Sequence, residues 1–167
     1  MKRLLLILIA LPMIGFGQNV NIPDVNFKTY LVGNDDINTN EDTEIQVSEA
    51  TAFNGQIECS YLGISDLTGI EVFTALTDLS CDNNQLTSLD VSNNTLLTRL
   101  DCMSLLLTNL DLSGATALTT LICWDNQLTS LDVSANTALT YLSCGFNNLD
   151  TLDVSNNIAL TNFNCSN

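Results

Sequence analysis

A repeat of 21 residues organises the chain from Leu76 onward and constrains the fold more than any other feature of the sequence. Its first half has the spacing L-x-x-L-x-C-x-x-N-x-L, and a degenerate copy that is one residue longer precedes it at Ile57 to Leu67. Successive steps of 21 residues give one column of large apolar residues and one of cysteines: Leu79, Leu100, Leu121, Leu142 and Phe163; Cys81, Cys102, Cys123, Cys144 and Cys165. A fixed period of this length predicts a solenoid, in which each coil buries its apolar side chains against its neighbours.

The second half of each repeat imitates the first. Leu89-Asp90-Val91 recurs as Leu110-Asp111-Leu112, and the same step leads to residues 131–133 and 152–154. In both halves apolar residues alternate with polar ones, which is the period of a β-strand, and no long helical stripe lies between them. We therefore expect a mainly β solenoid with two short parallel strands per coil, stacked into two narrow sheets, and a small helical N-terminal cap.

The repeat resembles that of bacterial leucine-rich-repeat proteins built from L-x-x-L-x-C-x-x-N-x-L-x-x-L-D-V-S-x-N-x-x units, which are exported from Gram-negative cells, and more distantly that of the internalins. The resemblance covers Ile57 to the C-terminus strongly and the preceding segment loosely. It implies a secreted or cell-surface protein used for adhesion or protein binding. It identifies no ligand, because one fold hosts many functions.

The six cysteines all follow the repeat register, with Cys59 as the first. Each occupies an apolar position, so we expect an inward column of reduced thiols. Stacked residues lie ~4.8 Å apart, which is within the Cα range of a disulfide, but their Cβ directions are parallel. A linear column also lacks the tetrahedral arrangement that zinc requires.

Three polar columns accompany the cysteines. Asparagines recur at the two corners of the coil, where an inward amide can bond to backbone groups of its own and the neighbouring coil: Asn84, Asn126 and Asn147; Asn94, Asn136 and Asn157. One coil has Leu105 and Ala115 at these corners, so Leu105 to Leu107 is either a local defect or an exposed apolar patch. The aspartates at 90, 111, 132 and 153 stack as like charges, which favours local hydrogen bonds to Ser or Thr over a calcium ladder.

The segment before the repeats lacks their register, as expected of a cap. Pro23-Asp24 predicts a helix through Leu31 that ends at Gly33, and residues 48–53 predict a second, short helix. Between them, residues 38–49 resemble an EF-hand calcium loop, with these candidate ligands: Asn38, Asn40, Asp42, Glu44 and Glu49. Asn at the first position and Thr43 where the loop normally has glycine depart from that pattern. Two interpretations remain, a weak calcium site and an acidic linker.

The N-terminus predicts a secretory signal at residues 1–17. Lys2 and Arg3 precede an apolar run, and Gly15-Phe16-Gly17 provides the small-residue exit. Cleavage near Gly17 would leave two basic and nineteen acidic residues, so the net charge would change from −15 to 2 − 19 = −17. Such a charge disfavours nucleic acid, and the mature chain has no predicted membrane span. The domain boundaries are then residues 18–55 for the cap and 56–167 for the solenoid, which we expect to continue beyond this chain because no polar terminal cap follows.

One sheet face contains the candidate ligand-binding residues. Most positions beside the inward cysteines are small or acidic, but five larger side chains interrupt that pattern: Arg99, Met103, Ile122, Trp124 and Tyr141. Surface drift explains them equally well. The sequence contains no histidine, the commonest general base, so we expect a binding module for a protein or glycan rather than an enzyme. The alternatives are a structural spacer and, remotely, a hydrolase, and no cofactor other than weakly bound calcium is expected.

Overall fold

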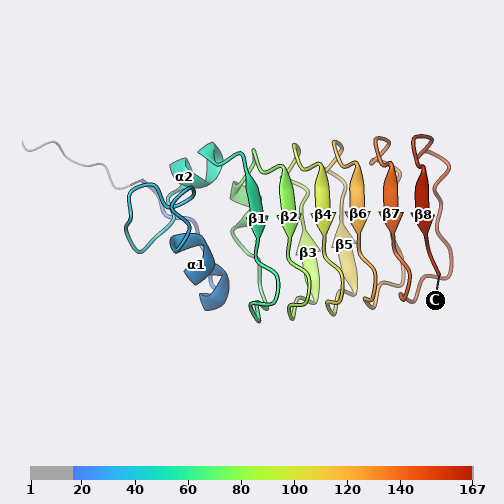
Figure 1. The fold of residues 1–167 in the computed structure, drawn as a ribbon, viewed down its shortest axis with the longest axis horizontal. Coiled ribbons are helices and arrows are strands. Elements are labelled where there is room, and N and C mark those ends of the chain that lie inside the picture. Colours follow the sequence, from blue (N-terminus) through green and yellow to red (C-terminus); the bar gives the residue numbers. More distant parts are fainter. Residues whose placement is uncertain (1–16, 167) are drawn as a thin grey trace, which may run out of the picture.

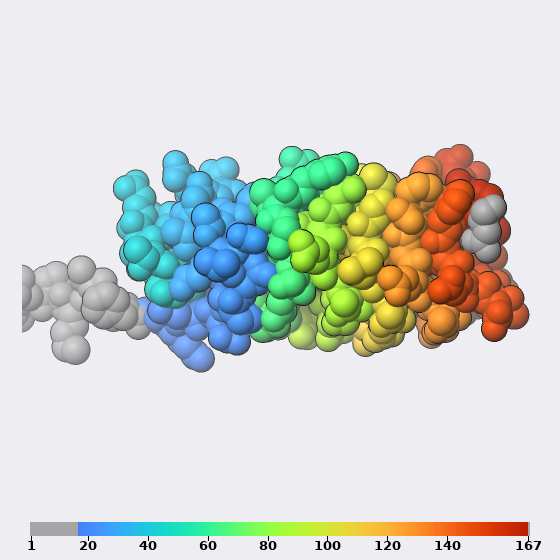
Figure 2. Space-filling view, turned by 90° about the horizontal axis from the view of Figure 1, so that it is seen from below, coloured from blue at the N-terminus to red at the C-terminus, as the bar shows by residue number. Residues whose placement is uncertain are grey.

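The computed structural model describes residues 17–166. The predicted signal segment therefore lies outside the described residues except for Gly17, and its cleavage remains a prediction. The described residues form an elongated stack of coils with a small helical region at the N-terminal end (Figure 1). Consecutive parts of the sequence follow one another as bands along the molecule (Figure 2). Each coil therefore contacts its sequence neighbours.

One strand from each coil joins a parallel sheet of six strands. In spatial order they are β1 (Gln56–Glu58), β2 (Asp78–Ser80), β4 (Arg99–Asp101), β6 (Thr120–Ile122), β7 (Tyr141–Ser143) and β8 (Asn162–Asn164). The register pairs equivalent residues of the repeat, such as Leu79 with Leu100 and Leu100 with Leu121. The predicted parallel solenoid is confirmed.

The other side of the coil has less regular structure than predicted. Only β3 (Ser88–Asp90) and β5 (Asn109–Asp111) pair there, and the first coil has a 3₁₀ helix at Ile70–Val72 instead of a strand. A second strand thus forms in two coils among the described residues. The apolar column on this side stays buried with or without strand pairing: Val91, Leu112 and Val133. Side-chain packing therefore defines this side more than backbone pairing does.

The asparagine columns lie inside the coil and bond to the backbone, as predicted. Asn126 Nδ2 donates to the carbonyls of Cys102 and Cys123 at 2.9 and 3.1 Å, and its Oδ1 accepts the N–H of Leu107 at 3.0 Å. At the opposite corner, Asn136 Nδ2 donates to carbonyls of the preceding coil, but its Oδ1 has no hydrogen-bond partner in the described structure. Both amides therefore form hydrogen bonds to the coil that precedes their own in the sequence.

The irregular corner is largely a packing variation. Leu105 and Leu107 are buried and only Leu106 is exposed, so two of the three leucines belong to the core. Ala115 is fully buried at the other corner. Apolar side chains there take the volume that asparagines fill in the other coils.

The cap contains both predicted helices. Helix α1 (Val25–Val32) begins after Asp24, whose carboxylate accepts the N–H groups of Asn26 and Phe27 at 2.9 and 3.0 Å. Helix α2 (Val47–Ala52) follows the acidic loop. Phe53 then packs edge-on against Phe73 with ring centroids 6.2 Å apart, which joins the cap to the first coil.

The last described coil differs from the inner ones. Phe163 is 46% exposed, whereas the equivalent leucines of the inner coils are fully buried. Cys165 is likewise exposed, so the prediction of an inward thiol is wrong at this position. The physical reason is that no described residue packs on the outer side of β8.

Candidate binding face

The outer face of the six-stranded sheet brings the five candidate residues into three neighbouring coils. Arg99 lies on β4, Ile122 on β6 and Tyr141 on β7, and the register makes Thr120 the neighbour of both Arg99 and Tyr141. Met103 and Trp124 follow β4 and β6 at equivalent positions, because Ser104 N–H donates to the Trp124 carbonyl at 3.0 Å. Tyr141 is exposed and the other four are half-buried. The structure thus places these residues on one continuous surface.

Phe146 extends this surface, although it was not among the candidate residues predicted from the sequence. Its ring lies edge-on to that of Trp124, with centroids 5.0 Å apart, and it is 52% exposed. It occupies the corner after β7, where the inner coils have Asn83, Ser104 and Asp125. All four residues have a left-handed backbone, which suits Asn and Asp but strains a bulky side chain. An aromatic residue at a position of small polar residues was the available signal.

Acidic side chains lie beside Trp124 on this face and continue from there toward the cap. The sheet face and its corner contain five of them: Glu58, Asp78, Asp82, Asp101 and Asp125. Arg99 lies among them, 2.9 Å from Asp101 and 3.7 Å from Asp78. Burial raises the pKa of Asp101 and of Asp78, and nearby Asp82 and Glu58 raise them further, while Arg99 opposes these shifts. Burial rather than charge repulsion therefore keeps the pKa of both carboxyls raised, because Arg99 affects each more than the neighbouring acid does.

The cysteine column offers no reactive thiol on the inner coils. Five cysteines are buried and unbridged, as predicted for Cys59 through Cys144. Burial raises the pKa of Cys59 to about 12 and that of Cys144 to about 11. Because the thiolate is the nucleophile, these thiols are unreactive at neutral pH and serve as core side chains.

The aspartate column on the other side of the coil stabilises turns. Each of Asp90, Asp111, Asp132 and Asp153 accepts the N–H of the serine two residues later, at 2.8 to 2.9 Å. Hydrogen bonds from Ser113 lower the pKa of Asp111, and those from Ser155 lower that of Asp153. Local hydrogen bonding, the favoured interpretation of this column, is confirmed.

The loop with the candidate calcium ligands is held by its own hydrogen bonds. Glu49 accepts the N–H groups of Thr39, Asn40 and Gln46 at 2.9 to 3.2 Å. Asp42 accepts the N–H of Glu44 at 2.7 Å, and Glu44 pairs with Lys28 at 2.7 Å.

Two further features of this loop bear on calcium. The left-handed residue is Glu41 rather than Thr43, so the chain turns earlier than in an EF-hand. Asn38 is buried, and its Oδ1 has no hydrogen-bond partner in the described structure. Within residues 17–166, no three His, Cys, Asp or Glu side chains gather in a metal-binding arrangement. Calcium binding remains a prediction.

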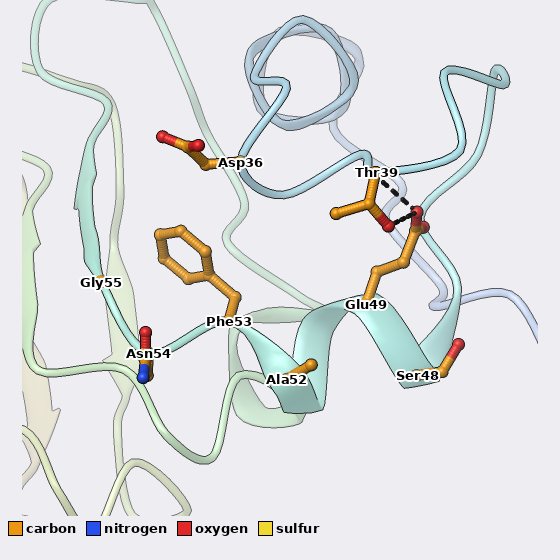
Figure 3. A pocket seen from close by; sticks show the side chains of 8 residues that line it. All are labelled: Asp36, Thr39, Ser48, Glu49, Ala52, Phe53, Asn54 and Gly55. Carbon is orange, nitrogen blue, oxygen red and sulfur yellow. Dashed lines mark hydrogen bonds between the residues drawn. The ribbon is translucent and has the colours of Figure 1, made fainter.

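A hollow of about 540 Å³ lies beside helix α2 in the cap. Thr39, Glu49 and Phe53 are among the residues that line it (Figure 3). The hydroxyl of Thr39 donates to Glu49 at 3.1 Å, so these two polar groups of the hollow bond to each other (Figure 3). The sheet face therefore remains the stronger candidate for ligand binding.

Comparisons with known proteins agree with the fold and its cysteine column. No protein-family model matches the chain. Internalin J of Listeria monocytogenes serotype 4b (strain F2365) is 44% identical over 74 residues, which are 44% of this chain and 8% of that protein. The solved functional domain of internalin J from Listeria monocytogenes, described as including a cysteine ladder, has a TM-score of 0.79 at 41% identity. That match covers 89% of this chain and 33% of the solved chain.

A second internalin supports the fold alone. The crystal structure of internalin F from Listeria monocytogenes strain 4b F2365 has a TM-score of 0.57 at 20% identity, covering 89% of this chain and 52% of that chain. Among residues 17–166, no helix is long and apolar enough to cross a membrane. The repeat register, the parallel solenoid and the likeness to internalin J together identify the chain as an internalin-like leucine-rich-repeat protein.

Proposed function

We propose that this protein is a secreted or cell-surface protein-binding module that binds its partner through the outer face of the six-stranded sheet. The observation that carries the proposal is the aromatic cluster, which we define as Trp124, Tyr141 and Phe146. Trp124 and Phe146 contact each other, and Tyr141 lies on the strand of the same coil as Phe146. Aromatic residues that are at least partly exposed and lie together on a rigid surface are frequent anchors of protein interfaces.

The scaffold supports a preformed surface. Backbone hydrogen bonds link neighbouring coils along the sheet, and the core beneath β4, β6 and β7 is fully buried at Leu100, Leu121 and Leu142. Gly145 is needed here, because a Cβ atom would lie 2.2 Å from the Ser166 carbonyl oxygen. A preformed surface loses little conformational entropy on binding, which favours affinity. The fold and the predicted export signal are compatible with an extracellular role.

Arrays of purified extracellular proteins and of glycans, probed with labelled wild-type protein, test this proposal. We expect at least one protein ligand whose affinity falls roughly tenfold or more in Trp124→Ala and in Phe146→Asn, as for interface anchors. Tyr61→Asn is the matched control, because Tyr61 is an exposed aromatic residue with the same left-handed backbone in the first coil. It should bind normally.

Other outcomes assign other functions. Ligands that bind all variants equally would overturn the role of this face and favour a structural spacer. If a glycan were the only ligand whose binding the substitutions weaken, the sheet face would still be the binding site, but the partner would be a glycan rather than a protein. Hydrolysis of an arrayed molecule would contradict a binding module.

A further inference from the structure

The charge beside the aromatic cluster indicates the chemistry of the partner. Asp125 is exposed and directly follows Trp124 in the sequence, and its carboxylate accepts the Ser104 hydroxyl at 3.0 Å. Asp82, Met103 and Trp124 occupy equivalent positions of three successive coils, which are linked by the hydrogen bonds of Asn83 to Met103 and of Ser104 to Trp124. Asp82 therefore lies about two strand spacings, ~10 Å, from Trp124 along the sheet, and Asp125 adjoins Trp124 in the chain.

Basic residues of this chain neutralise little of that charge. Among the described residues the only basic side chains are Lys28 and Arg99, and both already form ion pairs. Lys28 pairs with Glu44 in the cap, so Arg99 is the sole cation on the face. Asp82 and Asp125 bond to hydroxyl or amide groups rather than to a cation. Their charge is available to a partner.

The other acidic surface of the solenoid serves as an internal comparison. The aspartate column at 90, 111, 132 and 153 is acidic too, but its carboxylates hold local turns. The immediate sequence neighbours of each aspartate in that column are aliphatic, and none is aromatic. Acidic and aromatic groups thus adjoin on the sheet face, and this combination matches a partner that supplies both a cation and an apolar group.

We infer that the sheet face binds a polypeptide segment that presents lysine or arginine beside an apolar side chain. The cationic group would contact Asp82 or Asp125 while the apolar group packs on Trp124 and Phe146. This inference rests on the proposed function and names the chemistry of its partner. Attraction between the acidic face and a basic segment accelerates association and excludes acidic partners.

Three synthetic peptides of equal length separate the two requirements. Their repeating units are Lys-Gly-Phe-Gly, Glu-Gly-Phe-Gly and Lys-Gly-Ala-Gly. Calorimetry measures their affinity, and the emission of Trp124, the only tryptophan of the chain, reports contact with the face. The lysine–phenylalanine peptide should bind most tightly and should change the emission. Its affinity should fall on the order of tenfold when the NaCl concentration rises from low to high, because salt screens exposed charges.

Two double variants with the same change in net charge locate the interaction. Asp82→Asn with Asp125→Asn removes two charges from the face, and Asp132→Asn with Asp153→Asn removes two from the opposite column. Asparagine suits the left-handed backbone at position 125 and retains a side-chain oxygen for the turns at 132 and 153. The face variant should lose roughly fivefold in affinity for the lysine–phenylalanine peptide, and the column variant less than twofold.

Each other outcome contradicts the inference. Equal affinity for the lysine and glutamate peptides would overturn the requirement for a cation, and equal affinity for the alanine peptide would overturn the apolar requirement. Equal losses in both variants would show general attraction to an acidic protein. If the lysine–phenylalanine peptide did not bind, the inferred chemistry of the partner would also be overturned. The proposed function fails separately, by the array experiment, which depends on aromatic substitutions rather than charge.

Discussion

In the solenoid every coil repeats the contacts of its neighbour, whereas in the cap most polar contacts occur once. Leu100 and Leu121 have the same environment, and Asn126 and Asn147 make equivalent bonds to the backbone. In the cap, Asp24 alone links helix α1 to Ser65, through hydrogen bonds of 2.8 and 3.0 Å. The core of the solenoid therefore contains buried neutral thiols and amides, whereas an ionised carboxylate joins the cap to the first coil. The solenoid core should respond to alkaline pH, and the contact between the cap and the first coil should respond to acidic pH.

Alkaline pH should have the largest effect, and it should act on the solenoid. Burial raises the pKa of five thiols above the ordinary 9.0: Cys59, Cys81, Cys102, Cys123 and Cys144. A group whose pKa is raised by folding contributes stability fully below its unfolded pKa and loses it as pH rises toward the folded value. Each buried thiol should therefore lower the free energy of unfolding by about 1.4 kcal/mol for each pH unit above nine. Urea unfolding at pH 8 and pH 10 measures this.

A single substitution provides the control for the alkaline effect. Cys102→Val should reduce the pH-dependent loss by about one thiol's share, about 1.4 kcal/mol per pH unit. Denatured protein without reductant should show six reactive thiols, the full number in the sequence. Equal free energies of unfolding at both pH values, or fewer than six thiols, would contradict a reduced and buried column.

The two asparagine corners should differ in their contribution to stability. Asn126→Ala leaves the Cys102 carbonyl and the Leu107 N–H buried without partners, whereas Asn147 still donates to the Cys123 carbonyl; it should lower the free energy of unfolding by about 3 kcal/mol. After Asn136→Ala the carbonyls of Leu112 and Ala115 still accept backbone N–H groups, and an Oδ1 that has no partner is removed, so this variant should cost only about 1 kcal/mol. Thermal and urea unfolding give both values. A larger loss for Asn136→Ala would contradict the hydrogen bonding described for the two corners.

Acidic pH should loosen the cap before the solenoid. Partial burial opposes ionisation of Asp24, but hydrogen bonds from Phe27, Ser65 and Asn26 outweigh it and lower its pKa below the ordinary 3.8. A carboxyl whose pKa is lowered by folding contributes stability above its unfolded pKa and loses it as the pH falls through the folded value. Asp24→Ala should therefore expose residues 25–32 to hydrogen exchange at pH 7, at a cost of about 1 to 2 kcal/mol.

The matched variant for this carboxyl is Asp24→Asn, which keeps an acceptor for the helix N-terminus and should cost less. Hydrogen exchange followed by mass spectrometry compares residues 25–32 with the coil around Cys123. Equal loss of protection in both regions would contradict an independent response of the cap.

Calcium should have the smallest effect, and only on the cap. If residues 38–49 form a weak site, calcium at ten times its dissociation constant adds about 1.4 kcal/mol, which is a few degrees in melting temperature. Asn38→Ala should remove the response, and magnesium serves as the control ion. An unchanged melting temperature in wild type at tens of millimolar calcium would contradict the site.

The same comparison shows what the sequence could predict. A column such as Leu79, Leu100 and Leu121 occupies one environment, so its spacing predicted burial and register directly. The first helix of the cap was predictable from Asp24 and Gly33, because capping is a local interaction. The bonds of Asp24 to Ser65, and of Glu49 to Thr39, join residues that no periodic pattern relates.

The candidate site was predictable only in part, for a similar reason. Trp124 and Tyr141 stood out because they interrupt an alternating pattern whose orientation was known. Phe146 lies at a corner, beyond the strand, where alternation no longer indicates direction. The exposure of Phe163 and Cys165 depends on what packs beyond β8, which the repeat alone does not specify.

Fluorescence of Trp124 during ligand binding tests the central claim most directly, because the chain contains no other tryptophan and the indole lies on the sheet face. With a protein ligand found on the array, emission should shift to shorter wavelength, and quenching by acrylamide should decrease as the indole becomes buried. The change should saturate at the dissociation constant measured by calorimetry. A ligand that saturates in calorimetry while the emission and quenching of Trp124 stay unchanged would contradict binding at this face.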